Sequence, residues 1–80
     1  MTVNIEDIKR VVSLQMGIRD VGDKDHFLEE LGAESLDVLN IIAAIEEKYN
    51  VAIKDSEIPD LQTPTALYMF VKERSKTGIL

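Results

Sequence analysis

The chain has 80 residues, 45% of them hydrophobic, with no cysteine and a formal net charge of −6. This length suits one domain, residues 1–80, with a small core, and the lack of cysteine excludes disulfides and thiolate metal sites. The longest apolar run, five residues at 41–45, is too short to span a membrane, and no signal peptide is evident, so we expect a cytoplasmic monomer without membrane insertion.

The N-terminal residues show the pattern of an amphipathic helix. Apolar side chains recur there at helical spacing, at Ile5, Ile8, Val12 and Met16. Asn4 precedes them as a candidate N-cap, and Gly17 follows as a residue that often ends a helix in the left-handed conformation. The spacing predicts a first helix from about Asn4 to Met16.

Residues 18–34 form a long connection that carries much of the acidic charge. The overlapping segment 20–37 has seven acidic residues against one lysine, which accounts for the whole net charge. Its apolar residues are spaced like one helical turn and should pin it to the core: Phe27, Leu28 and Leu31. A surface of this sign repels phosphate backbones, so we expect no nucleic acid as a partner, and it attracts basic patches on proteins. The alternative is a solvated loop that keeps a small protein soluble.

The second predicted helix runs from Ser35 to Tyr49 and is apolar on more than one face. A helix in so small a protein cannot be buried on every side. Leu36 and Leu39, exposed beside acidic residues, would then form a mixed apolar and acidic docking surface. The alternative is that all the apolar residues of this helix belong to the core.

The segment after the second helix predicts a short irregular stretch. Val51-Ala52-Ile53 could pass for a strand, but no partner strand is evident, so we expect a buried connection. Residues 55–58 are expected to form a single helical turn that ends at Pro59.

A last helix is predicted from the pair Thr63-Pro64. The pair combines a hydroxyl N-cap with proline at the first helical position, and the helix should run to about Lys76, before Gly78. The elements together predict an all-α fold, a small antiparallel bundle of three main helices plus one short helix.

Ser35 lies where the connection meets the second helix. The first N–H groups of a helix lack intrahelical partners and, with the helix dipole, favour a negative group such as a phosphate. A serine nucleophile needs a base within hydrogen-bond reach, and the one histidine, His26, is expected to be a solvated loop residue. These features favour an attachment point for a prosthetic group over an enzyme acting through Ser35.

Two carboxylates flank this serine, Glu34 before the helix and Asp37 in its first turn. They could help to hold a metal ion while another enzyme modifies Ser35, or they could serve only as helix caps and charge compensation. No resident metal site is predicted, because an EF-hand loop started at Asp23 would place Leu28 where glycine is required.

Residues 31–37, Leu-Gly-Ala-Glu-Ser-Leu-Asp, resemble the phosphopantetheine-attachment motif of acyl carrier proteins. The resemblance covers nearly the whole chain. Residues 15–18 resemble the end of that family's first helix, residues 27–32 the approach to its serine, and residues 46–49 and 51–53 the end of its second helix and the exit from it.

The resemblance implies a 4′-phosphopantetheine arm on Ser35, taken from coenzyme A by a magnesium-dependent phosphopantetheinyl transferase, with acyl groups carried as thioesters on the terminal thiol. It implies partner enzymes with basic docking patches, recognised mainly by the second helix through Glu34, Leu36, Asp37, Leu39, Ala43, Glu46 and Glu47. It also implies that acyl chains fold back between the helices into a pocket lined by Ile41, Ile42, Ile45, Tyr49, Ile53 and Leu61.

A few positions depart from the pattern usual in that family. Glutamate replaces the usual aspartate at Glu34, an amide replaces an acid at Asn40, a base interrupts the acidic run at Lys48, and tyrosine replaces phenylalanine at Tyr49. These departures leave two carrier functions open: fatty-acid or related lipid biosynthesis, or a specialised discrete carrier of aminoacyl, polyketide or peptide intermediates. An unmodified scaffold or regulatory protein with the same bundle is a further alternative.

Overall fold

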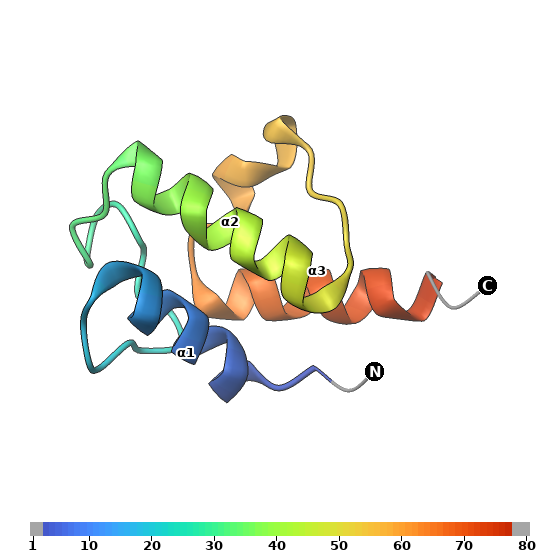
Figure 1. The fold of residues 1–80 in the computed structure, drawn as a ribbon, viewed down its shortest axis with the longest axis horizontal. Helices are drawn as coiled ribbons and strands as arrows, with labels where there is room; N and C mark the ends of the chain where they lie inside the picture. Colours follow the sequence, from blue (N-terminus) through green and yellow to red (C-terminus); the bar gives the residue numbers. More distant parts are fainter. Residues whose placement is uncertain (1–2, 78–80) are drawn as a thin grey trace.

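The computed structural model describes residues 3–77 and contains four helical elements in those residues. Figure 1 shows α1 (Ile5–Met16), α2 (Ser35–Tyr49), the short 3₁₀-helix η1 (Asp55–Asp60) and α3 (Pro64–Thr77). No strand occurs among the described residues, which confirms the predicted all-α bundle of three main helices and a short one. Gly78, expected after the last helix, lies outside the described residues.

Helix α1 begins and ends where the sequence predicts. The Asn4 side chain accepts a hydrogen bond from the backbone N–H of Glu6 at 2.8 Å, which satisfies one of the unpaired first-turn donors. Gly17 takes a left-handed conformation with φ 70°, and its N–H reaches the carbonyl of Ser13 at 2.9 Å. Ile8 and Val12 point into the core, so both caps hold an amphipathic helix in place.

Helix α2 supplies the largest share of the core and has the predicted bounds. It ends at Asn50, which takes a left-handed conformation with φ 54°, a role that the sequence analysis did not assign. Its inward face consists of Val38, Ile41, Ile42, Ile45 and Tyr49. The other face remains exposed, so the expectation that α2 is not buried on every side is confirmed.

The connection between α1 and α2 is held by one large side chain rather than three. Phe27 is fully buried, its N–H donates to the carbonyl of Gln62 at 2.8 Å, and its own carbonyl accepts from Ala33 at 2.8 Å. The expectation for Leu28 was wrong, because that side chain is 43% exposed, while Leu31 is half-buried. Val21, which the sequence analysis did not single out, is buried instead.

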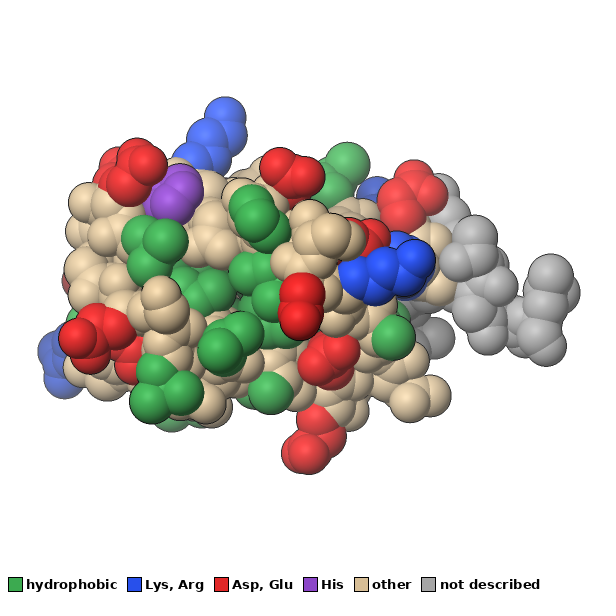
Figure 2. All heavy atoms as spheres, turned by 90° about the horizontal axis from the view of Figure 1, so that it is seen from above, with side chains coloured by type: hydrophobic (Ala, Val, Ile, Leu, Met, Phe, Trp, Pro, Cys, Tyr) green, Lys and Arg blue, Asp and Glu red, His purple; other side chains and the backbone are tan. Residues whose placement is uncertain are grey.

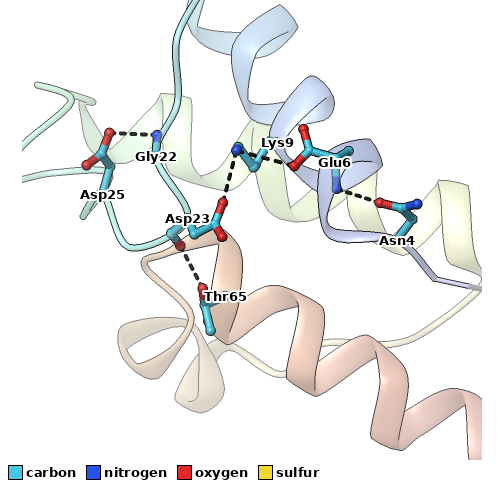
Figure 3. Close-up of polar contacts among 7 residues, drawn as sticks. All are labelled: Asn4, Glu6, Lys9, Gly22, Asp23, Asp25 and Thr65. Atoms are coloured by element: carbon cyan, nitrogen blue, oxygen red, sulfur yellow. Dashed lines mark hydrogen bonds and ion pairs between the residues drawn. The ribbon is translucent and has the colours of Figure 1, made fainter.

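Polar contacts fix the start of this connection against α1 and α3 (Figure 3). Lys9 pairs with the Asp23 carboxylate at 2.9 Å, and this hydrogen bond raises the pKa of the lysine ammonium. The Asp23 backbone carbonyl accepts from the hydroxyl of Thr65 at 2.8 Å and from its N–H at 2.9 Å. Three segments far apart in the sequence therefore meet at one residue.

The segment after α2 differs from expectation in two respects. Of the three residues expected to be a buried connection, Ile53 is buried, Val51 is half-buried and Ala52 is exposed. The helical turn does not end at Pro59 but continues to Asp60. Proline lacks a backbone N–H, so Pro59 removes only one hydrogen bond from this 3₁₀-helix. The helix can continue because the N–H of Leu61 donates to the Ile58 carbonyl at 2.9 Å.

Helix α3 begins as predicted and is tied back to η1. The Thr63 hydroxyl accepts from the N–H of Ala66 at 3.1 Å, and Pro64 is the first helical residue. Farther along, Arg74 pairs with Glu57 at 2.7 Å. No helix among residues 3–77 is long and apolar enough to cross a bilayer.

Tyr49 offers a test of how the core is built. Its hydroxyl is buried without a hydrogen-bond partner among the described residues, and burial, together with the Asp7 carboxylate, raises the pKa of this phenol above the usual 10.0. The folded state holds the phenol proton more tightly than the unfolded chain does. The stability that depends on this protonated phenol is therefore complete below about pH 10, and it is lost as the pH rises through the pKa of Tyr49 in the folded state.

We expect Tyr49→Phe to raise the free energy of unfolding by about 1 kcal/mol at neutral pH, since it removes an unpaired buried hydroxyl but keeps the ring. Urea unfolding at about pH 8 and about pH 11 should show the advantage of the variant widening at the higher pH. Tyr68→Phe controls for the loss of a phenol as such. If the stability advantage of Tyr49→Phe over the wild type became smaller as the pH rose, the Tyr49 hydroxyl would not be buried away from water in the folded protein.

Candidate functional site

Ser35 is the first residue of α2, and its side chain is exposed. The chain reaches it through a turn in which Gly32 has φ 71°, a conformation that favours glycine, and Ala33 is buried beneath that turn. Among the described residues, none forms a hydrogen bond with the Ser35 hydroxyl. The hydroxyl is thus accessible and chemically unoccupied at the N-terminus of a 15-residue helix.

The two carboxylates near Ser35 have different surroundings. Asp37 is half-buried, and its carboxylate accepts a hydrogen bond from the backbone N–H of Glu34 at 3.0 Å. Glu34 is exposed, and its own carbonyl accepts the first helical hydrogen bond, from Val38, at 3.1 Å. The Glu34 side chain in turn faces the backbone N–H of Asp37, so the two carboxylates form a reciprocal capping box at the start of α2, next to the serine.

His26 serves the backbone of the connection. Its Nδ1 accepts a hydrogen bond from the N–H of Glu29 at 3.2 Å, and its own N–H donates to the Glu30 carboxylate at 2.7 Å. These bonds cap the single helical turn that precedes Ser35, so His26 is more than the solvated loop residue that the sequence analysis expected. Because the lone pair of Nδ1 already accepts this hydrogen bond, it is not available to take a proton from a serine hydroxyl.

The exposed face of α2 combines apolar and acidic side chains. Leu36 is 67% exposed, Leu39 is 50% exposed, and Leu28 of the connection adds a third exposed leucine. Figure 2 looks onto the face formed by α2 and η1, where hydrophobic side chains gather in the middle and acidic ones lie around them. The alternative that every apolar residue of α2 lies in the core is therefore wrong.

The predicted recognition residues divide into exposed and structural members. The exposed ones are Glu34, Leu36, Leu39, Ala43 and Glu47. Glu46 is half-buried, and its carboxylate accepts from the backbone N–H of Ile53 at 2.9 Å, which holds the segment that leaves α2. Like Asp37, it has a structural bond that a charge reversal would break.

All the residues predicted to line an acyl pocket are buried in the core: Ile41, Ile42, Ile45, Tyr49, Ile53 and Leu61. Both α2 and α3 pack directly on α1. A hollow of about 460 Å³ lies elsewhere, between α1 and the start of the connection, with Lys9, Arg10 and Arg19 among its lining residues. None of the predicted site residues lines that hollow.

Gln62 is a buried polar residue that the sequence analysis missed. It is 8% exposed, and its Nε2 donates to the carbonyl of Ile58 at 2.8 Å. Its Oε1 is buried and has no hydrogen-bond partner in the part of the chain that the structure describes. An unpaired buried acceptor of this kind costs about 1–3 kcal/mol. No periodic signal could have identified it, because a glutamine before Thr63-Pro64 looks like an ordinary loop residue.

No group of three or more potential metal ligands occurs among residues 3–77. The site instead consists of an accessible hydroxyl, the unpaired N–H groups of the first turn of a helix, and a neighbouring apolar and acidic face. This arrangement can hold a covalently attached, negatively charged group at Ser35 and present it to another protein.

Comparisons with known proteins agree with this description. Residues 6–71 match the protein family described as "Phosphopantetheine attachment site". The chain is similar to a protein from Wolinella succinogenes named "Acyl carrier protein", with 42% identity over 60 residues, which cover 72% of this chain and 79% of that protein. It is also similar to an "Acyl carrier protein" from Chlamydia caviae, with 31% identity over 71 residues, covering 86% and 92% of the two chains.

Proposed function

Since the chain belongs to the phosphopantetheine-binding acyl carrier protein family, we propose that Ser35 is the residue that carries its 4′-phosphopantetheine arm. The family makes this chain a carrier rather than a catalyst and makes phosphopantetheine its prosthetic group. The single observation that supports Ser35 most strongly is its exposed, unengaged hydroxyl at the start of α2.

The surroundings of Ser35 fit a phosphodiester. The positive end of α2 and its unpaired N–H groups stabilise a negative group by about 0.3–1 kcal/mol at an exposed site. His26 is committed to the backbone of the connection, so the proton of the serine hydroxyl must leave to a base on the transferase. Ser35 supplies the oxygen of the new phosphodiester bond, the diphosphate bond of coenzyme A breaks, and adenosine 3′,5′-bisphosphate leaves, while the carrier remains catalytically passive. When bound, the arm supplies a terminal thiol that holds cargo as a thioester.

We further propose fatty-acid or related lipid biosynthesis as the pathway class. A core lined by isoleucine and leucine side chains suits alkyl cargo, at about 0.8 kcal/mol for each buried methylene group. The pocket proposed between the helices consists of Ile41, Ile42, Ile45, Tyr49, Ile53 and Leu61. These side chains pack against one another, so the core must open for the chain to enter.

A carrier of aminoacyl, polyketide or peptide units is the second candidate. The observation that favours it is the exposure of Asn40 and Lys48, which give α2 a less acidic outer face than a continuous run of acids would. Mild thioester cleavage of the protein purified from its own cells, followed by mass measurement of the released cargo, distinguishes the two. A fatty acid supports the first candidate, and an amino acid or a polyketide supports the second.

The partners we propose are a phosphopantetheinyl transferase and acyl-transferring enzymes with basic docking patches. They would bind the exposed face of α2, which includes Leu36 and Leu39 and where hydrophobic side chains lie among acidic ones (Figure 2). The exposed leucines bury apolar area on docking, and the acids speed the encounter with a basic surface. Asp37 and Glu46 contribute charge to this face but also bond to the backbone, so they are poor probes of recognition alone.

Glu47→Lys is the cleaner probe of this docking face, because Glu47 is exposed and no ion pair or hydrogen bond is assigned to it. We expect the variant to associate with a phosphopantetheinyl transferase about threefold or more slowly at low salt, and the difference to shrink as salt rises. The free energy of unfolding should change by less than about 0.5 kcal/mol. Stopped-flow association and urea unfolding measure the two quantities.

The matched control is Glu73→Lys, which makes the same charge change at an exposed position on α3. It should leave association nearly unchanged. Equal slowing by the two variants would show that net charge, rather than the face of α2, governs the encounter.

The experiment that separates a carrier from an unmodified scaffold is a loading assay. The protein is incubated with coenzyme A, magnesium and a broad-specificity phosphopantetheinyl transferase, and its intact mass is measured. A carrier gains one phosphopantetheinyl group, whereas a scaffold keeps its original mass under conditions in which a known carrier is loaded.

A further inference from the structure

The side chain of Gln62 has one half of its amide paired and the other half unpaired. Nε2 donates to the Ile58 carbonyl at 2.8 Å, which fixes the orientation of the amide, since the reverse orientation would bring two acceptor oxygens together. Oε1 is buried and has no partner within residues 3–77, in a residue that is 8% exposed. Buried acceptors in folded proteins are nearly always paired, so this one calls for a donor.

Gln62 lies close to the approach to Ser35. Its backbone carbonyl accepts from the N–H of Phe27 at 2.8 Å, and the Phe27 carbonyl accepts from Ala33, two residues before Ser35. On its other side, Gln62 follows Leu61, which is buried and belongs to the proposed acyl pocket. Gln62 therefore lies between the connection that leads to Ser35 and the core residues of the proposed acyl pocket.

The neighbouring backbone donors are already used. The N–H of Phe27 bonds to the Gln62 carbonyl, the N–H of Leu61 bonds to Ile58, and the N–H of Ala66 bonds to the Thr63 hydroxyl. Within the hydrophobic core of the described residues, only Tyr49 and Tyr68 have a side-chain donor, and the buried Tyr49 hydroxyl forms no hydrogen bond with Oε1. A saturated acyl chain in this place would also supply no donor, so it would leave Oε1 as it is.

We infer that Oε1 of Gln62 accepts a hydrogen bond from an N–H or O–H group of the loaded moiety. The donor is either an amide of the pantetheine arm or a hydroxyl on the acyl chain. This inference rests on the proposed function and deepens it, because it makes Gln62 a residue that binds the loaded moiety: it positions the arm if the donor is an amide, and it selects hydroxyl-bearing cargo if the donor is on the acyl chain.

The test compares four forms of the protein, each verified by intact mass: unmodified, loaded with the free-thiol arm, loaded with a saturated acyl group, and loaded with the 3-hydroxyacyl group of the same length. The readouts are the ¹³C resonance of the Gln62 side-chain carbonyl and the hydrogen-exchange protection of core amides. The comparison variant is Gln62→Met, which has similar length and no acceptor oxygen. Comparing the unmodified variant with the unmodified wild type measures the effect of losing the hydrogen bond to Ile58, separately from any effect of loading.

In the wild type, we expect the carbonyl resonance to move downfield on loading. A move already present with the free-thiol arm assigns the donor to the arm, and a move present with the hydroxyacyl form alone assigns it to the cargo. Core protection should rise on loading by about three- to tenfold more in the wild type than in Gln62→Met.

An unchanged resonance across all four forms would overturn the inference, as would equal gains in protection for the wild type and Gln62→Met. Either result would come from protein that is demonstrably loaded, so it would leave the proposed function in place. Failure to load any form would instead count against the proposed function.

Discussion

Replacing Ser35 by alanine is expected to abolish loading with phosphopantetheine and to leave the fold in place. The substitution removes the one oxygen that the proposal requires, so the loss should be complete rather than partial. The side chain is exposed and no hydrogen bond is assigned to it, and alanine is a good helix former, so the free energy of unfolding should change by less than about 0.5 kcal/mol. Intact mass after the transferase reaction and urea unfolding measure the two effects.

Ser56→Ala is the matched control for this prediction. Ser56 is also an exposed serine in a helical element, η1, but it lies away from the start of α2. The control should load as the wild type does. Loading of Ser35→Ala at the wild-type level would contradict the assignment of the attachment site.

Phe27→Ala is expected to have the largest effect on stability. The Phe27 side chain is fully buried, and truncating a buried phenylalanine costs about 3–5 kcal/mol. Small domains are stable by only about 5–15 kcal/mol in total, so much of the stability would be lost. Loading should slow as well, because Phe27 anchors the connection that presents Ser35 and bonds through its backbone to Gln62 and Ala33.

The neighbouring residue provides the control. Leu28→Ala removes a side chain that is 43% exposed, so it should cost about 1 kcal/mol or less. Denaturant unfolding of both variants gives the comparison. If Leu28→Ala proved as costly as Phe27→Ala, the connection would be packed differently from the arrangement described above.

Local signals in the sequence were enough to place the main helices. Asn4 and Gly17 bound α1, and Thr63-Pro64 starts α3, because caps depend on residues close to one another in the chain. The position of Ser35 at the start of α2 and the exposure of Leu36 also followed from periodicity and from the small size of the protein. The continuation of η1 through Pro59 did not, since it depends on how Leu61 closes the next turn.

The roles of individual polar side chains could not be predicted, because they depend on tertiary neighbours. Glu46 bonds to Ile53, seven residues away, and the acidic pattern of α2 gives no sign of it. His26 accepts from a backbone N–H in a turn that also contains the buried Phe27. The same limit applies to Gln62, whose unpaired oxygen becomes apparent only when the surrounding core is known.

The most direct test of the account is to locate the attached group in the loaded wild-type protein. Trypsin cleavage after Lys24 and Lys48 releases residues 25–48 as one peptide, in which Ser35 is the sole hydroxyl-bearing residue. Peptide mass mapping should find one phosphopantetheinyl group on this peptide and none on the others. A group found on a different peptide, or a protein that stays unmodified while a known carrier is loaded in the same reaction, would contradict the assignment of Ser35.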